Sequence, residues 1–434
     1  MTSAALSLEQ APPLSVPLRF FLTAPLFGMA AAAMLLLAGP DVLLSRWSPA
    51  TLALTHLFVL GVLTMVMCGA LFQMLPVLVG AHVRRPRLWG GICHGLLAGG
   101  TAALAAAFLT TAPLAFRCAL MLLGGGLALF VVVLGGGLLR APRVHDSVRG
   151  MRWAAGGLAV TVGLGLALTL GHAWASLPIL RVPLTDLHLS WGLLGWVALL
   201  ITVVSWQVIP MFQMTPEYPR WLRRWMPAAI FALLAWFSLS AAVTWPGSSL
   251  PLAGLAAACA GYAVWTLVLL AQRRRTIGDV NLWFWRLGMA ALIAAALFAL
   301  AGRFGLPPAA SRLALAPALL FLAGFALSVV NGMLYKIVPF LVWLHLQQRI
   351  GEHPAARGQV APPNMRAVIR EPRARAQWWL HAAGLTLLLA GLAAPVLLRP
   401  AAVVWFASFA LLGYNLFTAA RLYRSEAARI AACG

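Results

Sequence analysis

Residues 57–79 read LFVLGVLTMVMCGALFQMLPVLV and contain no charged side chain. An α-helix needs about 20 consecutive apolar residues to cross the hydrocarbon core of a bilayer. Lipid offers no hydrogen bonds to the backbone, so such a stretch must satisfy its own polar groups as a helix. Comparable stretches recur along the chain, at 19–37, 50–80, 90–111, 114–139, 153–176, 187–214, 226–245, 250–271, 282–302, 312–346, 377–397 and 400–420. The sequence therefore predicts an all-α polytopic membrane protein with 12 transmembrane helices.

The composition of the whole chain agrees with this interpretation. Of the 434 residues, 62% are hydrophobic and 9% are charged, and the mean hydropathy is +0.91. Water-soluble domains carry close to a quarter charged residues, so this composition excludes a soluble fold. The lipid bilayer is the first partner that the sequence predicts.

The net charge of +22 raises the question of a nucleic-acid partner, but its distribution argues against one. Arginines cluster after alternate spans, as at 84–87, 220–224 and 273–275, and no soluble segment is long enough to fold as a nucleic-acid-binding module. Positive charge accumulates on the cytoplasmic side of membrane proteins. We therefore expect a bacterial inner membrane protein with both termini in the cytoplasm. The Pro- and Arg-rich segment 347–376 is predicted to be a basic cytoplasmic linker against anionic lipid headgroups.

Three spans share a sequence pattern. Residues 61–76 read GVLTMVMCGALFQMLP, residues 195–210 read GWVALLITVVSWQVIP, and residues 324–339 read GFALSVVNGMLYKIVP. Each runs from glycine to proline over the same length, with an aromatic residue and then Gln or Lys before the proline. The pattern predicts a single membrane domain, 1–434, built from three four-helix units at 19–139, 153–271 and 282–420. The alternative is that glycine and proline are simply common in membrane helices.

Twelve helices in three arcs of four, with cytoplasmic termini, resemble the catalytic subunit I of haem-copper oxidases and its relatives, including the NnrS family of haem- and copper-containing membrane proteins. The most specific likeness is residues 55–76, THLFVLGVLTMVMCGALFQMLP, which resembles the oxidase helix that carries a low-spin haem ligand. The resemblance implies b-type haem, with copper as a second possibility, and a role in respiratory redox, nitric-oxide-related or metal handling. It also implies other respiratory membrane subunits or a periplasmic electron donor as partners. However, residues 311–327 contain no histidine and the chain has no His-His pair, which argues against a binuclear centre and favours an NnrS-like or other divergent member.

Topology places His56, His172 and His188 near the periplasmic ends of their spans. Neutral imidazoles at one depth can ligate haem iron or copper, and the neighbouring Asp186 can orient one of them. The alternative is that each is a polar residue at the membrane interface. Four further histidines, His82, His94, His345 and His381, are predicted at the cytoplasmic ends of the spans, and most of them at the headgroup level, His94 least clearly so.

A second function is compatible with the repeat. Lys336, the chain's one lysine, lies within the third patterned span, and Gln73 and Gln207 hold the equivalent positions in the other two. An ionisable residue inside a membrane helix indicates function, so these three side chains predict a polar path in a transporter or permease. The alternative for Lys336 is snorkelling to the headgroups.

Overall fold

The computed structural model describes residues 11–80, 83–141, 146–174, 176–177, 181–242, 249–302, 312–356 and 359–433. Within these ranges the chain is all-α and forms no strand. Twelve helices there are long and apolar enough to cross a membrane. The protein is an integral multi-pass membrane protein, and the predicted fold class is confirmed.

Nine of the spans consist mainly of one α-helix each: α1 (Ser15–Ala38), α4 (Pro86–Thr110), α5 (Pro113–Arg140), α6 (Asp146–Ala173), α9 (Arg220–Ala242), α10 (Ser249–Ala271), α11 (Val280–Ala301), α15 (Glu371–Ala393) and α16 (Leu398–Ala432). The second, sixth and tenth spans are composite. They pair α2 (Pro49–Phe58) with α3 (Met65–Val79), α7 (Arg181–Ser190) with α8 (Leu199–Gln213), and α12 (Ala316–Leu319) with α13 (Leu327–Glu352).

The predicted spans and the observed helices differ chiefly at their ends. The tenth span continues to Glu352, and the eleventh begins at Glu371. The segment 347–376 is consequently helical at both ends, with the short α14 (Met365–Val368) between them. Residues 175 and 243–245, at the predicted ends of the fifth and seventh spans, lie outside the described residues.

A π-helical segment interrupts each composite span. These segments are Val59–Thr64, Trp191–Ala198 and Leu320–Ala326, and they contain the three glycines of the shared pattern. The three prolines lie inside the α-helices that follow. Single π-helical turns inside α-helices are uncommon and are frequent at functional sites. All three spans with the shared sequence pattern thus share an unusual backbone as well.

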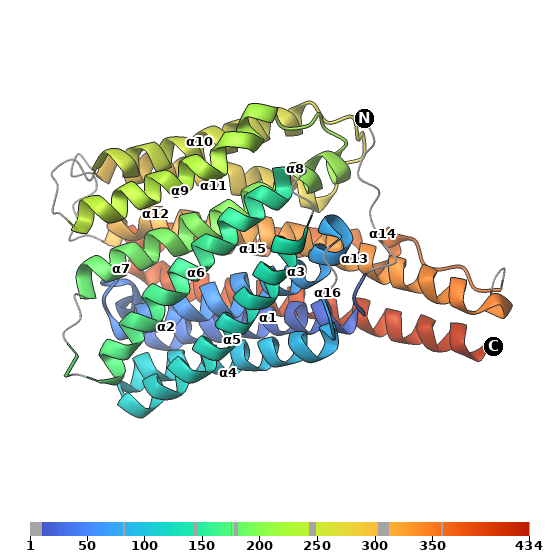
Figure 1. The fold of residues 1–434 in the computed structure, drawn as a ribbon, viewed down its shortest axis with the longest axis horizontal. Coiled ribbons are helices and arrows are strands. Elements are labelled where there is room, and N and C mark those ends of the chain that lie inside the picture. The colour runs from blue at the N-terminus through green and yellow to red at the C-terminus, as the bar shows by residue number, and fades with distance from the viewer. Residues whose placement is uncertain are drawn as a thin grey trace.

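The composite spans form the interior of the bundle. In their most apolar windows, 83%, 72% and 67% of residues are buried, against 22–44% in the other nine spans. Figure 1 shows the helices running side by side along the bundle, with α16 ending at the same end of the bundle where α1 begins. We call this end, which carries Arg84–Arg87 and Arg220–Arg224, the arginine-rich end. The opposite end carries Arg46 and Arg181, and His56 and His188 lie in its half of the bundle.

Close helix contact at Gly157 fixes α6 against the second π-helical segment. A Cβ atom at Gly157 would collide with the backbone carbonyl of Gly195, and neither backbone can move freely within a packed bundle. We expect Gly157→Ala to destabilise the protein by about 1–3 kcal/mol, the usual cost of an overpacked interior. Thermal unfolding in detergent measures this, with Gly163→Ala as control because Gly163 on the same helix faces open space. Equal unfolding temperatures for the two variants would contradict the contact.

Candidate functional site

A cavity of about 440 Å³ lies between the helices in the half of the bundle that contains His56 and His188, opposite the arginine-rich end. Its walls come from the first six spans, with further residues from the tenth span, α15 and α16. Apolar side chains such as Leu104, Phe108, Leu123 and Leu158 form most of the surface. Its volume falls within the range of about 300–1,000 Å³ that is usual for ligand and cofactor pockets.

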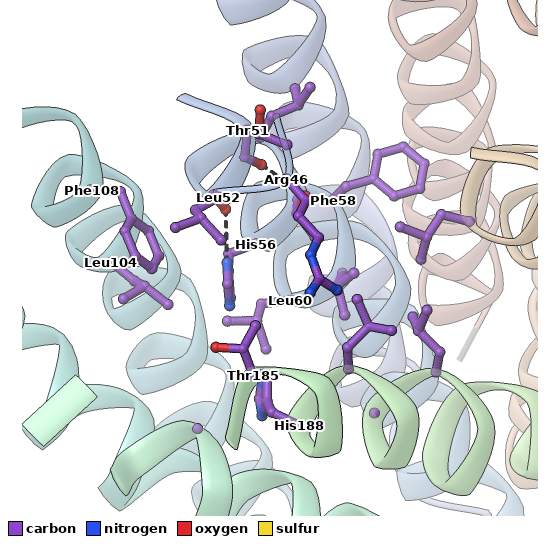
Figure 2. Close-up of a pocket in the computed structure, with 18 of the residues that line it drawn as sticks. Arg46, Thr51, Leu52, His56, Phe58, Leu60, Leu104, Phe108, Thr185 and His188 are labelled. Atoms are coloured by element: carbon purple, nitrogen blue, oxygen red, sulfur yellow. Dashed lines mark hydrogen bonds between the residues drawn. The ribbon is translucent and has the colours of Figure 1, made fainter. Parts of the chain in front are cut away.

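His56 projects into this cavity from the last turn of α2. Its Nδ1 atom lies 2.7 Å from the carbonyl oxygen of Leu52, one turn earlier on the same helix. A carbonyl only accepts, so Nδ1 carries the hydrogen and donates it. The Nε2 atom is therefore the nitrogen with a free lone pair, and Figure 2 shows the ring directed from α2 toward the helix that carries His188.

His188 enters the same cavity from α7 and is oriented in the same way. Its Nδ1 atom donates to the carbonyl oxygen of Thr161, on α6, over 3.0 Å. Gly165 lies one turn farther along α6, and a Cβ atom there would come within 2.9 Å of the His188 ring. The missing side chain at Gly165 is what leaves room for the imidazole.

The two imidazole rings form a pair. Their centroids are 6.3 Å apart and their planes are 15° from parallel. Each ring uses Nδ1 on a backbone carbonyl, which fixes its tautomer and leaves Nε2 as an acceptor or metal ligand. The rings belong to different spans, so the pairing depends on where the bundle places α2 relative to α7.

Charged residues stand where the cavity meets the end of the bundle. The Arg46 guanidinium pairs with Asp186 over 2.7 Å, and Arg181 donates to the carbonyl of Gly171 over 3.1 Å. Both arginines line the cavity. The prediction that Asp186 orients a histidine is wrong, because its carboxylate pairs with Arg46 while backbone carbonyls hold both imidazoles.

His172 lines the cavity but is not part of the histidine pair. Its ring stacks on Phe116 with centroids 4.8 Å apart, and Phe108 contacts both His172 and His56. Phe108 thus lies between the two histidines. Among the residues that the structure describes, no group of three or more His, Cys, Asp or Glu side chains is arranged to hold a metal ion.

No protein-family model matches this chain, and no curated protein matches it in sequence. The fold class and the side chains themselves therefore carry the functional argument.

The three residues of the predicted polar path have different surroundings. Lys336 forms an ion pair with Asp279, and Arg275 lies 3.5 Å from the same carboxylate. Gln73 is buried, and its Oε1 atom has no hydrogen-bond partner among the described residues. Gln207 is half-buried. Lys336 is thus paired with the residue that caps the N-terminus of α11.

Several histidines predicted at headgroup level are packed inside the bundle instead. His381 is buried and bonds to Ser328 over 2.8 Å. His345 bonds to the carbonyls of Leu341 and Pro12. His94 is half-buried against Thr23, and His82 lies outside the described residues. The prediction fails for His381 because α15 begins earlier than expected, which places this residue well inside its helix.

Proposed function

We propose that the protein binds b-type haem between His56 and His188 and serves respiratory redox, nitric-oxide-related or metal handling in a bacterial inner membrane. The observation that carries the proposal is the histidine pair itself. Two nearly parallel imidazoles from different spans each have Nδ1 on a carbonyl and Nε2 free, inside an apolar cavity. Neutral histidines held by such outer contacts are typical metal ligands.

The residues present fit a haem by spacing. A metal–imidazole bond is about 2.0 Å long, so two imidazoles that bind one ion from opposite sides have ring centres about 6 Å apart. The observed 6.3 Å agrees with that value.

The walls and the mouth of the cavity suit the porphyrin ring and the carboxylates of a haem. Apolar side chains exclude water from the region around the rings. Arg46 and Arg181 each have guanidinium donors beyond those already used, and arginine binds carboxylates well. These two residues would hold the carboxylates of the haem edge. Bound there, haem would supply one-electron redox chemistry or a gas-binding iron.

Copper fits less well than haem. Protein copper sites usually draw on three or more ligands, whereas Phe108 separates His172 from the pair. A copper site would need a ligand in addition to His56 and His188, and His172 is the nearest candidate that the sequence offers.

The orientation in the membrane follows from charge. If the arginine-rich end faces the cytoplasm, both termini are cytoplasmic and the histidine pair lies toward the periplasm. A periplasmic electron donor or another respiratory membrane subunit would then be the natural partner. The transporter alternative has weaker support, because Asp279 already neutralises the positive charge of Lys336.

Absorption spectroscopy tests the proposal directly. Protein produced with ample haem and purified in detergent is expected to show a reduced-minus-oxidised b-type spectrum, with about one haem per chain by pyridine extraction. Protein that stays colourless under these conditions, while folded and monodisperse, would contradict the proposal. A spectrum that persists when both His56 and His188 are replaced would move the haem elsewhere.

A further inference from the structure

Three helices away from the histidine pair are joined by buried polar side chains. Ser328 on α13 bonds to His381 on α15 over 2.8 Å. Gln377 on α15 donates to Ser408 on α16 over 3.0 Å, and Asn415 on α16 donates to Tyr335 on α13 over 3.1 Å. Each pair of helices is thus linked once, and we call these six residues with Asn331 the α13–α15–α16 cluster.

Several atoms of this cluster have no partner. Asn331 is 1% exposed, and both its Oδ1 and its Nδ2 atoms lack a hydrogen bond among the described residues. Gln377 Oε1 and Asn415 Oδ1 are also buried and unpaired. A buried polar atom without a partner is destabilising, and native proteins nearly always satisfy such atoms, with ordered water where no protein group reaches.

Asn331 lies at the centre of the cluster along α13. It follows Ser328 by one helical turn and precedes Tyr335 by another, so the three side chains project from one face of the helix. The neighbouring face of α15 carries Gln377 and His381, which are also one turn apart. The unpaired amide of Asn331 therefore stands between two of the hydrogen bonds that join the helices.

The unpaired polar atoms of the cluster include both a hydrogen-bond donor and hydrogen-bond acceptors, and this combination indicates the ligand that they bind. Asn331 Nδ2 donates, whereas the oxygens of Asn331, Gln377 and Asn415 accept. A cation would leave the Asn331 N–H group without an acceptor, and an anion would meet three oxygen atoms. The nearest charged side chain along α13, Lys336, is already paired with Asp279. Water both donates and accepts, and a buried water commonly makes about three hydrogen bonds to otherwise unsatisfied groups.

We propose that Asn331 is the centre of an internal binding site for ordered water molecules, enclosed by α13, α15 and α16. The water molecules bridge Asn331 to the free oxygens of Gln377 and Asn415. The site is separate from the cavity of His56 and His188. Trp405, whose ring is 6.5 Å from that of His381 and lines that cavity, stands between the two.

X-ray hydroxyl-radical footprinting of the full chain in lipid nanodiscs tests this site, because radicals formed from a bound water label the side chains beside it even when bulk solvent has no access. Tyr335 and His381 are expected to be labelled clearly above Trp285, an aromatic residue that is 1% exposed. Mixing with ¹⁸O-labelled water is expected to show slow incorporation at both. Labelling of Tyr335 and His381 at the level of Trp285 would mean a dry cluster and would overturn the proposal.

Two variants make the test specific to Asn331. Asn331→Leu keeps the shape of the side chain without its polar atoms, and is expected to lower the labelling of Tyr335 and His381 to the level of Trp285. Asn331→Ser keeps a hydroxyl and is expected to retain it. Labelling that is unchanged in a folded Asn331→Leu protein would refute the role of Asn331. His56→Ala should leave the labelling unchanged, so the result stands apart from the haem proposal.

Discussion

Replacing His56 or His188 with alanine is expected to abolish the b-type haem spectrum of the purified protein. Each variant removes one of the two imidazoles of the pair, and leaves a single histidine to hold the haem. The loss of a ligand is not compensated nearby, because Phe108 separates His172 from the pair. Haem content per chain and the reduced-minus-oxidised spectrum measure the effect.

His172→Ala is the matched control for this experiment. His172 lines the same cavity and stacks on Phe116, so the variant also removes an imidazole from the cavity wall. It is expected to keep the position and intensity of the haem bands. Retention of haem by His188→Ala together with its loss in His172→Ala would contradict the assignment and would favour the other pairing that the sequence allows.

Gly165→Val is expected to weaken haem binding without removing any ligand. A Cβ atom at this position would meet the His188 ring at 2.9 Å, and the branched side chain adds further atoms in the same direction. Overpacking of this kind costs about 1–3 kcal/mol, and about 1.4 kcal/mol corresponds to a tenfold change in affinity. Titration of haem into protein purified without it should therefore show binding roughly tenfold weaker or more.

Gly163→Val provides the control on the same helix. Gly163 faces open space, so its replacement changes the composition of α6 equally without touching His188. Wild-type affinity in Gly163→Val and reduced affinity in Gly165→Val is the expected pair of results. Equal affinities in both variants would show that the room beside His188 has no bearing on binding.

Much of the fold could be predicted because a membrane helix can be recognised from its own stretch of sequence. Each span is a run of apolar residues, and arginines cluster after alternate spans, so neither signal depends on distant contacts. The depths of His56 and His188 followed from the same reasoning. The ends of the spans did not, since Glu371 and Arg375 extend α15 beyond its apolar core with side chains that tolerate the interface.

The pairing of residues across spans could not be predicted from the sequence. Depth places His56, His172 and His188 in one layer, but which two face each other depends on how each helix is rotated in the bundle. The same limit explains Asp186, which was expected beside a histidine and instead reaches Arg46. Gly165 was missed because a glycine that makes room for a ring looks like any other glycine in an apolar helix. His381 gave no signal distinguishing it from a polar residue at a helix end, and the position of Asn331 in the middle of the span 312–346 did not show which side chains surround it.

The π-helical segment Val59–Thr64 sets the angular position of His56 relative to the rest of its span. Each residue turns an α-helix by about 100°, and a π-helical residue turns the backbone less because its hydrogen bond closes a wider ring. If the same residues were wound as α-helix, the extra rotation of roughly 100° would carry His56 away from the cavity. The wide turn is therefore as much a determinant of the histidine pair as the histidine itself.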